Sequence, residues 1–187
     1  GGEAYNCLLC ALFPAGQLRV EPYNRVVSDA GGLDEASLVS ALEGAGMVVG
    51  ARSDAPVRPS ERGRMGMYAF GAWRELAYTG DRPDDPAGSL DAAILQDRVL
   101  GPVLGVEDPR EDGRISFVPG MEGPEGLERR AGEKGVAFSL FPTSMAELMA
   151  VSDAGLLMPP KSTWLEPKLR SGLFVRRVSH RQSLLDG

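Results

Sequence analysis

The chain has few of the residues that catalysis and metal binding most often use. Its 187 residues include one histidine and two cysteines, and only 6% are aromatic. His180 lies in a basic C-terminal stretch with no partner base or placed nucleophile beside it, so we do not expect a serine or cysteine triad. Cys7 and Cys10 would need two further ligands to form a zinc site, which one histidine cannot supply. The sequence therefore predicts no metal site.

Long apolar runs and an excess of positive charge are also missing. No run approaches the roughly 20 apolar residues that a membrane-spanning helix needs, and the N-terminus has no basic region ahead of an apolar one. Acidic residues outnumber basic ones, 26 to 20, which gives a formal net charge of −6. Nucleic acids and anionic membranes bind basic surfaces. We therefore expect a cytoplasmic protein with neither partner, and the oligomeric state stays open.

The remaining composition is that of a folded protein. Hydrophobic residues make up 43% and charged residues 25% of the chain, which is ordinary for a globular domain. The length favours one domain over residues 1–187. Because two glycines lead at once into an apolar run, we interpret the chain as the C-terminal fragment of a longer protein.

Short strands alternate loosely with helices, and at least one hairpin lies among them. This order favours an α+β fold with a mixed, mainly antiparallel sheet and helices packed on it. Strands are expected at residues 8–13, 18–27, 47–49, 65–70, 73–78, 115–118, 136–141 and 172–175. Pro22 is expected either to make 18–27 an edge strand or to break it near residues 23–25. Helices are expected after Asp34, Ser89, Pro124 and Ser144, where residues that can cap or open a helix precede apolar periodicity.

The two cysteines fall in the first apolar run. A redox-active C-x-x-C sits at the N-terminus of a helix, whereas the surroundings of Cys7 and Cys10 are apolar and strand-like. Free cysteine is among the most buried residue types. We expect both to be buried structural residues.

The stretch 158–172 is the leading candidate for a binding site. It contains three prolines, which fix the backbone and lower the entropy lost when polar groups between them become ordered. Lys161, Ser162 and Thr163 offer an ammonium group and two hydroxyls that can hold a phosphate or carboxylate, and Arg170 can add a bidentate contact. Catalytic residues are not identified by this pattern.

A second anion contact is predicted at Arg25, beside Asn24 on the strand that Pro22 interrupts. The charged stretch 107–114 is interpreted as a solvated turn. The alternative for 158–172 is a rigid crossing between a helix and a last strand, with its hydroxyls bonded to the turn backbone and its cations in water. No Walker P-loop is present, because the pattern G-x-x-x-x-G-K-[ST] is missing.

With these residues in hand, the chain resembles an uncharacterised family of bacterial and archaeal proteins. Its members carry a domain of unknown function and are sometimes described as ParB-like, under the label SpoOJ/ParA/ParB/RepB. The matching stretches are 18–27, 90–109 with the core "ILQ…LGVEDPR", 138–144 and 158–172. They spread over nearly the whole chain.

The resemblance implies that full-length members are about twice as long as this chain, with an Asp-Gly-His-His-Arg motif in the preceding half. That motif and the Pro-Pro-Lys-Ser-Thr of residues 159–163 are similar to those of small ParB-like kinases that phosphorylate free serine with a nucleotide. Trp164 stands where the kinases have an arginine, so the pattern does not predict a phosphate contact there. By this resemblance, ATP or ADP with magnesium is the cofactor of the full-length protein.

Two functions follow as hypotheses. In the first, the chain is the C-terminal portion of a ParB-like small-molecule kinase of the free serine type, or of a related nucleotide-using enzyme. In the second, it is a non-catalytic domain that binds a ligand or a partner, because it contains no complete acid/base set. Such a non-catalytic domain could also be regulatory. The candidate residues are suited to a small-molecule anion or a nucleotide as ligand, and the sequence does not decide whether the chain is an enzyme.

Overall fold

The computed structural model describes residues 9–168, 170 and 172–175. Contacts divide the chain into two compact units, one of residues 20–164 and one made of the ends, 1–19 and 165–187. The described residues of the second unit include the 3₁₀ turn η2 (Ala15–Gln17), and most of them are exposed. The first unit contains the sheet, the helices and the core.

The unit 20–164 is built on one six-stranded sheet. Its strand order is β3-β5-β4-β7-β2-β6, and every neighbouring pair is antiparallel. The strands are β2 (Tyr23–Val27), β3 (Met47–Val49), β4 (Arg64–Ala69), β5 (Ala72–Tyr78), β6 (Ile115–Pro119) and β7 (Val136–Leu140). The predicted α+β class with a mainly antiparallel sheet is confirmed.

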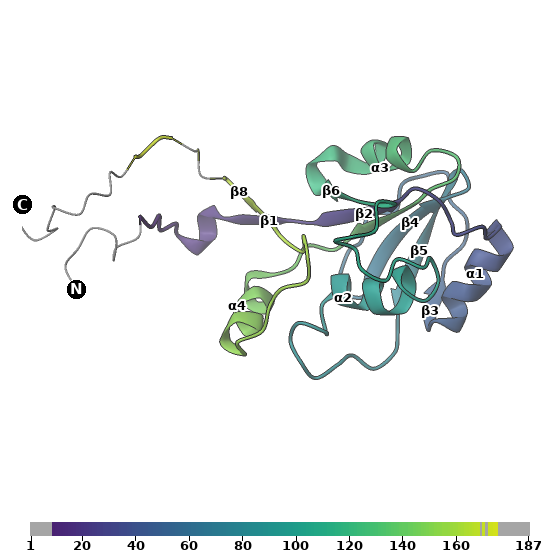
Figure 1. The fold of residues 1–187 in the computed structure, drawn as a ribbon, viewed down its shortest axis with the longest axis horizontal. Helices are drawn as coiled ribbons and strands as arrows, with labels where there is room; N and C mark the ends of the chain where they lie inside the picture. The colour runs from purple at the N-terminus through teal and green to yellow at the C-terminus, as the bar shows by residue number, and fades with distance from the viewer. Residues whose placement is uncertain (1–8, 169, 171, 176–187) are drawn as a thin grey trace, which may run out of the picture. The chain divides into compact units, whose positions relative to one another are not determined.

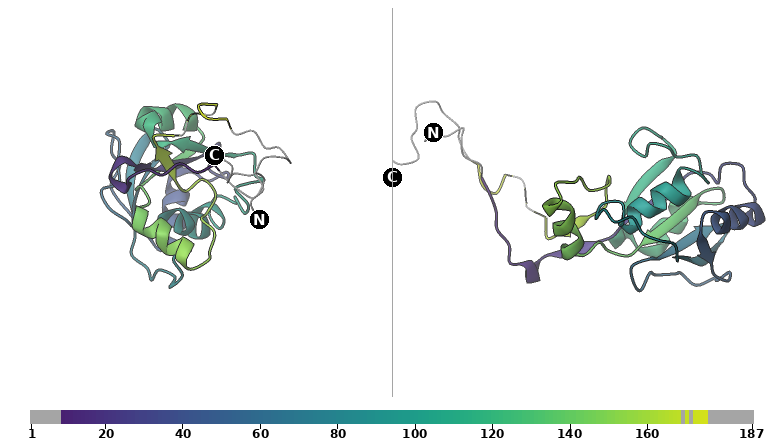
Figure 2. Two further views of the ribbon diagram at one scale, coloured as in Figure 1. Left: turned by 90° about the vertical axis from the view of Figure 1, so that its left-hand side faces the viewer. Right: turned by 90° about the horizontal axis from the view of Figure 1, so that it is seen from below.

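Helices cover both faces of this sheet. They are α1 (Glu35–Gly44), α2 (Asp91–Leu95) continuing into the wider turn η3 (Gln96–Leu100), the 3₁₀ turn η4 (Gly120–Glu122) leading into α3 (Gly123–Ala131), and α4 (Met145–Asp153). In Figure 1 and in the left view of Figure 2, α3 lies above the sheet while α2 and α4 lie below it. Each face of the sheet thus packs against a different set of helices.

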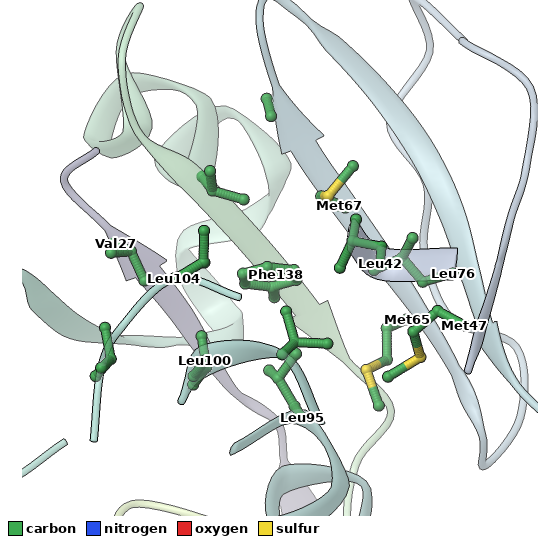
Figure 3. Packing of buried hydrophobic residues seen from close by; sticks show 14 of the residues in the cluster. Val27, Leu42, Met47, Met65, Met67, Leu76, Leu95, Leu100, Leu104 and Phe138 are labelled. Atoms are coloured by element: carbon green, nitrogen blue, oxygen red, sulfur yellow. The ribbon is translucent and has the colours of Figure 1, made fainter. Parts of the chain in front are cut away.

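The alternation of β7 divides the core between the faces. Phe138 is fully buried among apolar residues of β2, β4 and the α2–η3 segment (Figure 3). Its neighbour Ala137 joins a separate cluster with Trp73 and with Leu127 of α3. Successive strand residues point to opposite faces, so this five-residue strand, apolar except for Ser139, contributes to both layers.

The helix starts follow the residues expected to cap them. Asp34 accepts a hydrogen bond from the backbone nitrogen of Ser37 at 2.8 Å. Ser144 and Glu147 form a reciprocal capping box at the start of α4. The helix expected after Ser89 begins instead at Asp91, with Leu90 as an N-cap that makes no side-chain bond.

The hairpin between β4 and β5 turns one residue earlier than expected. Phe70 and Gly71 both have positive φ, 52° and 74°. Two consecutive positive values belong to a type I′ turn.

Two predicted strands are wrong. Residues 9–13 have no regular structure, and Cys10 in that run is exposed rather than buried. Residues 172–175 form no strand either. The short strands outside the main sheet are β1 (Arg19–Glu21), which Pro22 separates from β2, and β8 (Trp164–Glu166). The break expected near residues 23–25 is wrong, because these residues lie within β2, which has a neighbouring strand on each side. Cys7 and His180 lie outside the described residues.

None of the helices in the described part of the chain combines the length and apolar character that a membrane crossing requires. Within the same residues, no three His, Cys, Asp or Glu side chains are grouped so that they could hold a metal ion.

Candidate anion-binding site

Arg25 is a buried cation in the middle of the sheet. It lies on β2 opposite Phe117 of β6 and Phe138 of β7, and only 3% of its surface is exposed. The central carbon of its guanidinium group is 4.6 Å from the centroid of the Phe117 ring. This distance permits a cation–π contact on one side of the guanidinium plane.

Backbone carbonyls accept the hydrogen bonds of Arg25. Nη1 donates to the oxygen of Tyr23 at 2.7 Å, and Nη2 donates to the oxygen of Pro160 at 3.0 Å. Within residues 9–168, 170 and 172–175, no carboxylate forms an ion pair with it. Burial lowers the pKa of Arg25 to about 10, so the group keeps its charge at neutral pH. A buried charge is ordinarily paired, and Arg25 has no carboxylate partner among the described residues.

A cavity of about 310 Å³ opens beside Arg25. Gln96, Asp97, Arg110 and Pro160 also line it. Arg110 and Asp97 are exposed, and neither side chain forms a hydrogen bond or ion pair with any described residue. Two arginines and one carboxylate thus face the same space, which leaves it with an excess of positive charge.

Segments far apart in the chain build this cavity. The side-chain amide of Gln96 donates to the oxygen of Val106 at 2.7 Å and fixes the loop that carries Arg110. A small apolar cluster of Leu90, Val151 and neighbours packs α4 against α2 and includes Met158 at its edge. These contacts place residues 157–160 next to the α2–η3 segment.

The predicted site residues are only partly brought together. Arg25 lines this cavity, as do Pro159 and Pro160 of the proline-rich stretch, whereas Asn24 lines a different one. Arg170 belongs to the other unit, where it is exposed.

The three residues after Pro160 serve the turn in which they lie. Ser162 is buried and its hydroxyl donates to the oxygen of Pro159. Lys161 has a positive φ of 52°, and its Nζ lies 5.8 Å from the ring centroid of Tyr23. Thr163 is half-buried. None of the three lines the Arg25 cavity.

Sequence reasoning missed Gln96, Asp97 and Arg110. The first two fall within the stretch 90–109 that carries the family resemblance, but they have no local pattern of a binding site. Arg110 was assigned to a solvated turn, because alternating charges near Pro109 and Gly113 are typical of surface loops. Arg110 lies near Arg25 only because of how the chain folds, and no local sequence pattern indicates this proximity.

Comparison with known proteins gives limited information. No curated protein matches the chain. A mutant of a free serine kinase in complex with AMP aligns with a TM-score of 0.45 and 16% identity, over 80% of this chain and 54% of that one. SbnI with a C-terminal truncation, from Staphylococcus aureus, aligns with a TM-score of 0.43 and 15% identity, over 82% and 52%. The chain thus spans about half the length of these proteins, and similarity of this degree does not establish a shared activity.

The N-terminal half has a match among protein families. Residues 1–93 match the model described as "Protein of unknown function (DUF1015)". The description contains no reference to ParB, so that part of the expected resemblance is not confirmed. The match supports placing this half of the chain in an uncharacterised family with a domain of unknown function.

Proposed function

We propose that the Arg25 cavity binds the phosphate group of a nucleotide, and that the chain is the C-terminal portion of a small-molecule kinase of the free serine type or a related nucleotide-using enzyme. One observation carries the proposal. Arg25 is 3% exposed, keeps its charge at neutral pH and has no carboxylate partner in the described part of the chain. An anionic ligand would supply the missing counter-charge.

The geometry of arginine favours phosphate at this position. A guanidinium group has five N–H donors in a rigid fork. Nη1 of Arg25 donates to the carbonyls of Tyr23 and Asn24, Nη2 donates to that of Pro160, and Nε donates to no described residue. Donors therefore remain for a ligand. Arg110, on the other side of the cavity, adds a second cation at its rim. Phosphoryl transfer depends mostly on positioning and charge stabilisation, which two such cations can provide.

Magnesium would enter with the nucleotide. Mg²⁺ is commonly held by one or two carboxylates together with substrate phosphates, and Asp97 is the carboxylate in this cavity. Lys161, Ser162, Thr163 and Arg170 remain proposed anion contacts of the proline-rich stretch. We assign no catalytic base within the described residues.

A non-catalytic ligand-binding domain is the second candidate. It is favoured by the engagement of Ser162, whose hydroxyl donates to a turn carbonyl, and by the presence of only one carboxylate, Asp97, in the cavity. Such a domain would bind the same anion without turnover.

Isothermal titration calorimetry with ADP, ATP and inorganic phosphate tests the binding site. We expect ADP to bind, and Arg25→Met to weaken it at least about tenfold, the equivalent of about 1.4 kcal/mol. Arg98→Met is the matched control, because Arg98 is exposed in η3 and does not line the cavity. No binding of any of the three ligands, or equal binding by Arg25→Met, would contradict the proposal.

A serine phosphorylation assay separates the two candidate functions. Turnover that Arg25→Met removes supports the kinase. Binding of ADP without phosphorylation of serine or other small hydroxyl compounds supports the non-catalytic domain.

A further inference from the structure

A second cavity, of about 210 Å³, lies on the opposite face of the sheet. The loop at 57–59, the start of α3 and the end of β7 enclose it, together with Asn24 of β2. Asn24 precedes Arg25 in the strand, so the two side chains point to opposite faces. The cavity is therefore separate from the proposed nucleotide site.

Asn24 has an unused hydrogen-bond donor at this cavity. Only 4% of the residue is exposed. Its Oδ1 accepts from the backbone nitrogen of Leu140 at 3.0 Å, which fixes the orientation of the amide. Its Nδ2 donates to no described residue. Among the described residues, every side-chain nitrogen or oxygen that is completely shielded from solvent has a hydrogen-bond partner, so Nδ2 is not completely shielded. Nδ2 therefore retains access to the cavity that Asn24 lines.

Arg58 supplies a positive charge at the rim. It is exposed, and within the described residues its side chain forms no hydrogen bond or ion pair. No acidic residue lines the cavity. An anion would therefore find a counter-charge here, whereas an ammonium group would find none.

The start of α3 adds to the positive potential. Gly123 and Pro124, the first two residues of this nine-residue helix, line the cavity. The side chain of Glu122 does not cap the helix, because it is bonded to Arg130, with both contacts at 2.9 Å. Glu125 in the first turn is exposed and does not line the cavity. The positive end of the helix dipole thus faces the same space as the Asn24 amide.

The rest of the lining is mostly apolar. Leu127, Leu140 and Pro142 form part of the wall. The hydroxyl of Ser139 donates to the oxygen of Val57 at 3.0 Å, so its proton is already used. One donor-rich end and an apolar wall fit a ligand with a charged head and a short hydrocarbon body.

We propose that this cavity binds a small monocarboxylate, whose oxygens accept from Nδ2 of Asn24 and pair with Arg58 while its apolar body packs on Leu127 and Pro142. A volume of 210 Å³ corresponds to about seven water molecules at their liquid volume of about 30 Å³. A ligand of about seven non-hydrogen atoms, such as 3-methylbutanoate, matches that space. A zwitterionic amino acid is disfavoured, because its ammonium group has no acidic partner.

Two-dimensional ¹H–¹⁵N NMR tests this site by titration with sodium 3-methylbutanoate. The side-chain amide of Asn24 gives its own pair of signals, which the variant Asn24→Asp identifies by their disappearance. We expect these signals and the backbone amide of Gly123 to shift with the carboxylate. The neutral analogue 3-methylbutanamide and the zwitterion L-leucine have similar bodies, and neither should produce these shifts.

Arg58→Gln is the variant that leaves folding intact, because Arg58 is exposed and unbonded within the described chain. It should weaken 3-methylbutanoate about threefold to tenfold, while the matched control Arg98→Gln leaves the affinity unchanged. Arg25→Met should also leave it unchanged, which distinguishes this site from the proposed nucleotide site. Equal shifts with the neutral amide, unshifted Asn24 side-chain signals, unaltered affinity in Arg58→Gln or stronger binding of inorganic phosphate would each overturn the proposal.

Discussion

Asn24 and Arg25 are consecutive residues of β2, and their side chains line separate cavities on opposite faces of the sheet. Both are at least nine-tenths buried. Asn24 uses its oxygen to accept from β7, and Arg25 uses its nitrogens to donate to the carbonyls of Tyr23 and Pro160. One short strand thus presents an uncharged donor to one cavity and a cation to the other.

Anion binding at Arg25 should be lost at alkaline pH. Burial lowers the pKa of Arg25 from its ordinary value to about 10, so the folded protein releases this proton at a lower pH than the unfolded chain. Binding of ADP requires the charged guanidinium group, so its affinity should be constant from about pH 8 to about pH 9 and then fall about tenfold per pH unit above about pH 10. Calorimetric titrations across this range measure the profile.

Deprotonation of Arg25 weakens ADP binding but should increase the stability of the folded protein. Because the folded state disfavours the charged form of Arg25, its contribution destabilises the protein below about pH 10, and this penalty is relieved as the pH rises through 10 toward 12.5. Deprotonation of Arg25 therefore does not unfold the protein, and a loss of ADP binding above about pH 10 reports the loss of charge at the site. An affinity that stays constant to about pH 11 would show that Arg25 does not hold the ligand.

Gly66 of β4 allows the loop at residue 57 to cross the sheet. A Cβ atom at this position would collide with the carbonyl oxygen of Val57 and with Oγ of Ser139. We expect Gly66→Ala to destabilise the protein by about 1–3 kcal/mol, because one of these contacts is backbone and cannot rotate away. It should also displace a wall of the Asn24 cavity, and so weaken 3-methylbutanoate.

Gly44→Ala is the matched control for that substitution. Gly44 ends α1, and a Cβ there meets no atom within 4 Å. Alanine in a helix is favoured over glycine by about 0.5–1 kcal/mol, so this variant should be neutral or slightly more stable in urea unfolding. Equal stability of the two variants would contradict the close packing inferred at Gly66.

Much of the fold is encoded locally and could be predicted from the sequence. The stretch 136–140, apolar except for Ser139, is a central strand whose residues are all buried, because both faces of the sheet are covered. Asp34 and Ser144 mark helix starts because their side chains accept from backbone nitrogens one turn later. Capping involves residues only three positions apart, so a cap can be recognised from the sequence alone.

The site could be predicted only in part. The sequence predicts an anion contact at Arg25, and the structure places this residue in the lining of a cavity. The strand alternation that separates it from Asn24 is itself a local property. Asp97 of η3 and Arg110 of the following loop line the same cavity as Arg25. No local sequence pattern indicates that the loop folds back in this way. The strands predicted over the apolar runs at 9–13 and 172–175 are wrong. An apolar run becomes buried only where another apolar surface packs against it, and the local sequence does not indicate whether such a surface is present.

The position of α3 on the sheet depends on a bond between Trp73 and Glu128. Trp73 is fully buried, and its Nε1 donates to Oε1 of Glu128 at 2.7 Å. Glu128→Ala should cost about 1–3 kcal/mol in urea unfolding, because it leaves a buried donor without an acceptor. Glu128→Gln, which keeps an acceptor oxygen, should cost less, and Glu133→Ala at an exposed position should stay within about 0.5 kcal/mol of the wild type.

A double-mutant cycle assigns the cost of Glu128→Ala to the indole bond. Trp73→Phe keeps an aromatic ring but removes the donor, so in that background Glu128→Ala should lose most of its effect. The cycle separates the hydrogen bond from the helix propensity of residue 128, which is the same in both backgrounds. If Glu128→Ala costs as much beside Phe as beside Trp, α3 is held to the sheet by apolar contacts such as those of Leu127, and the bond contributes nothing to stability.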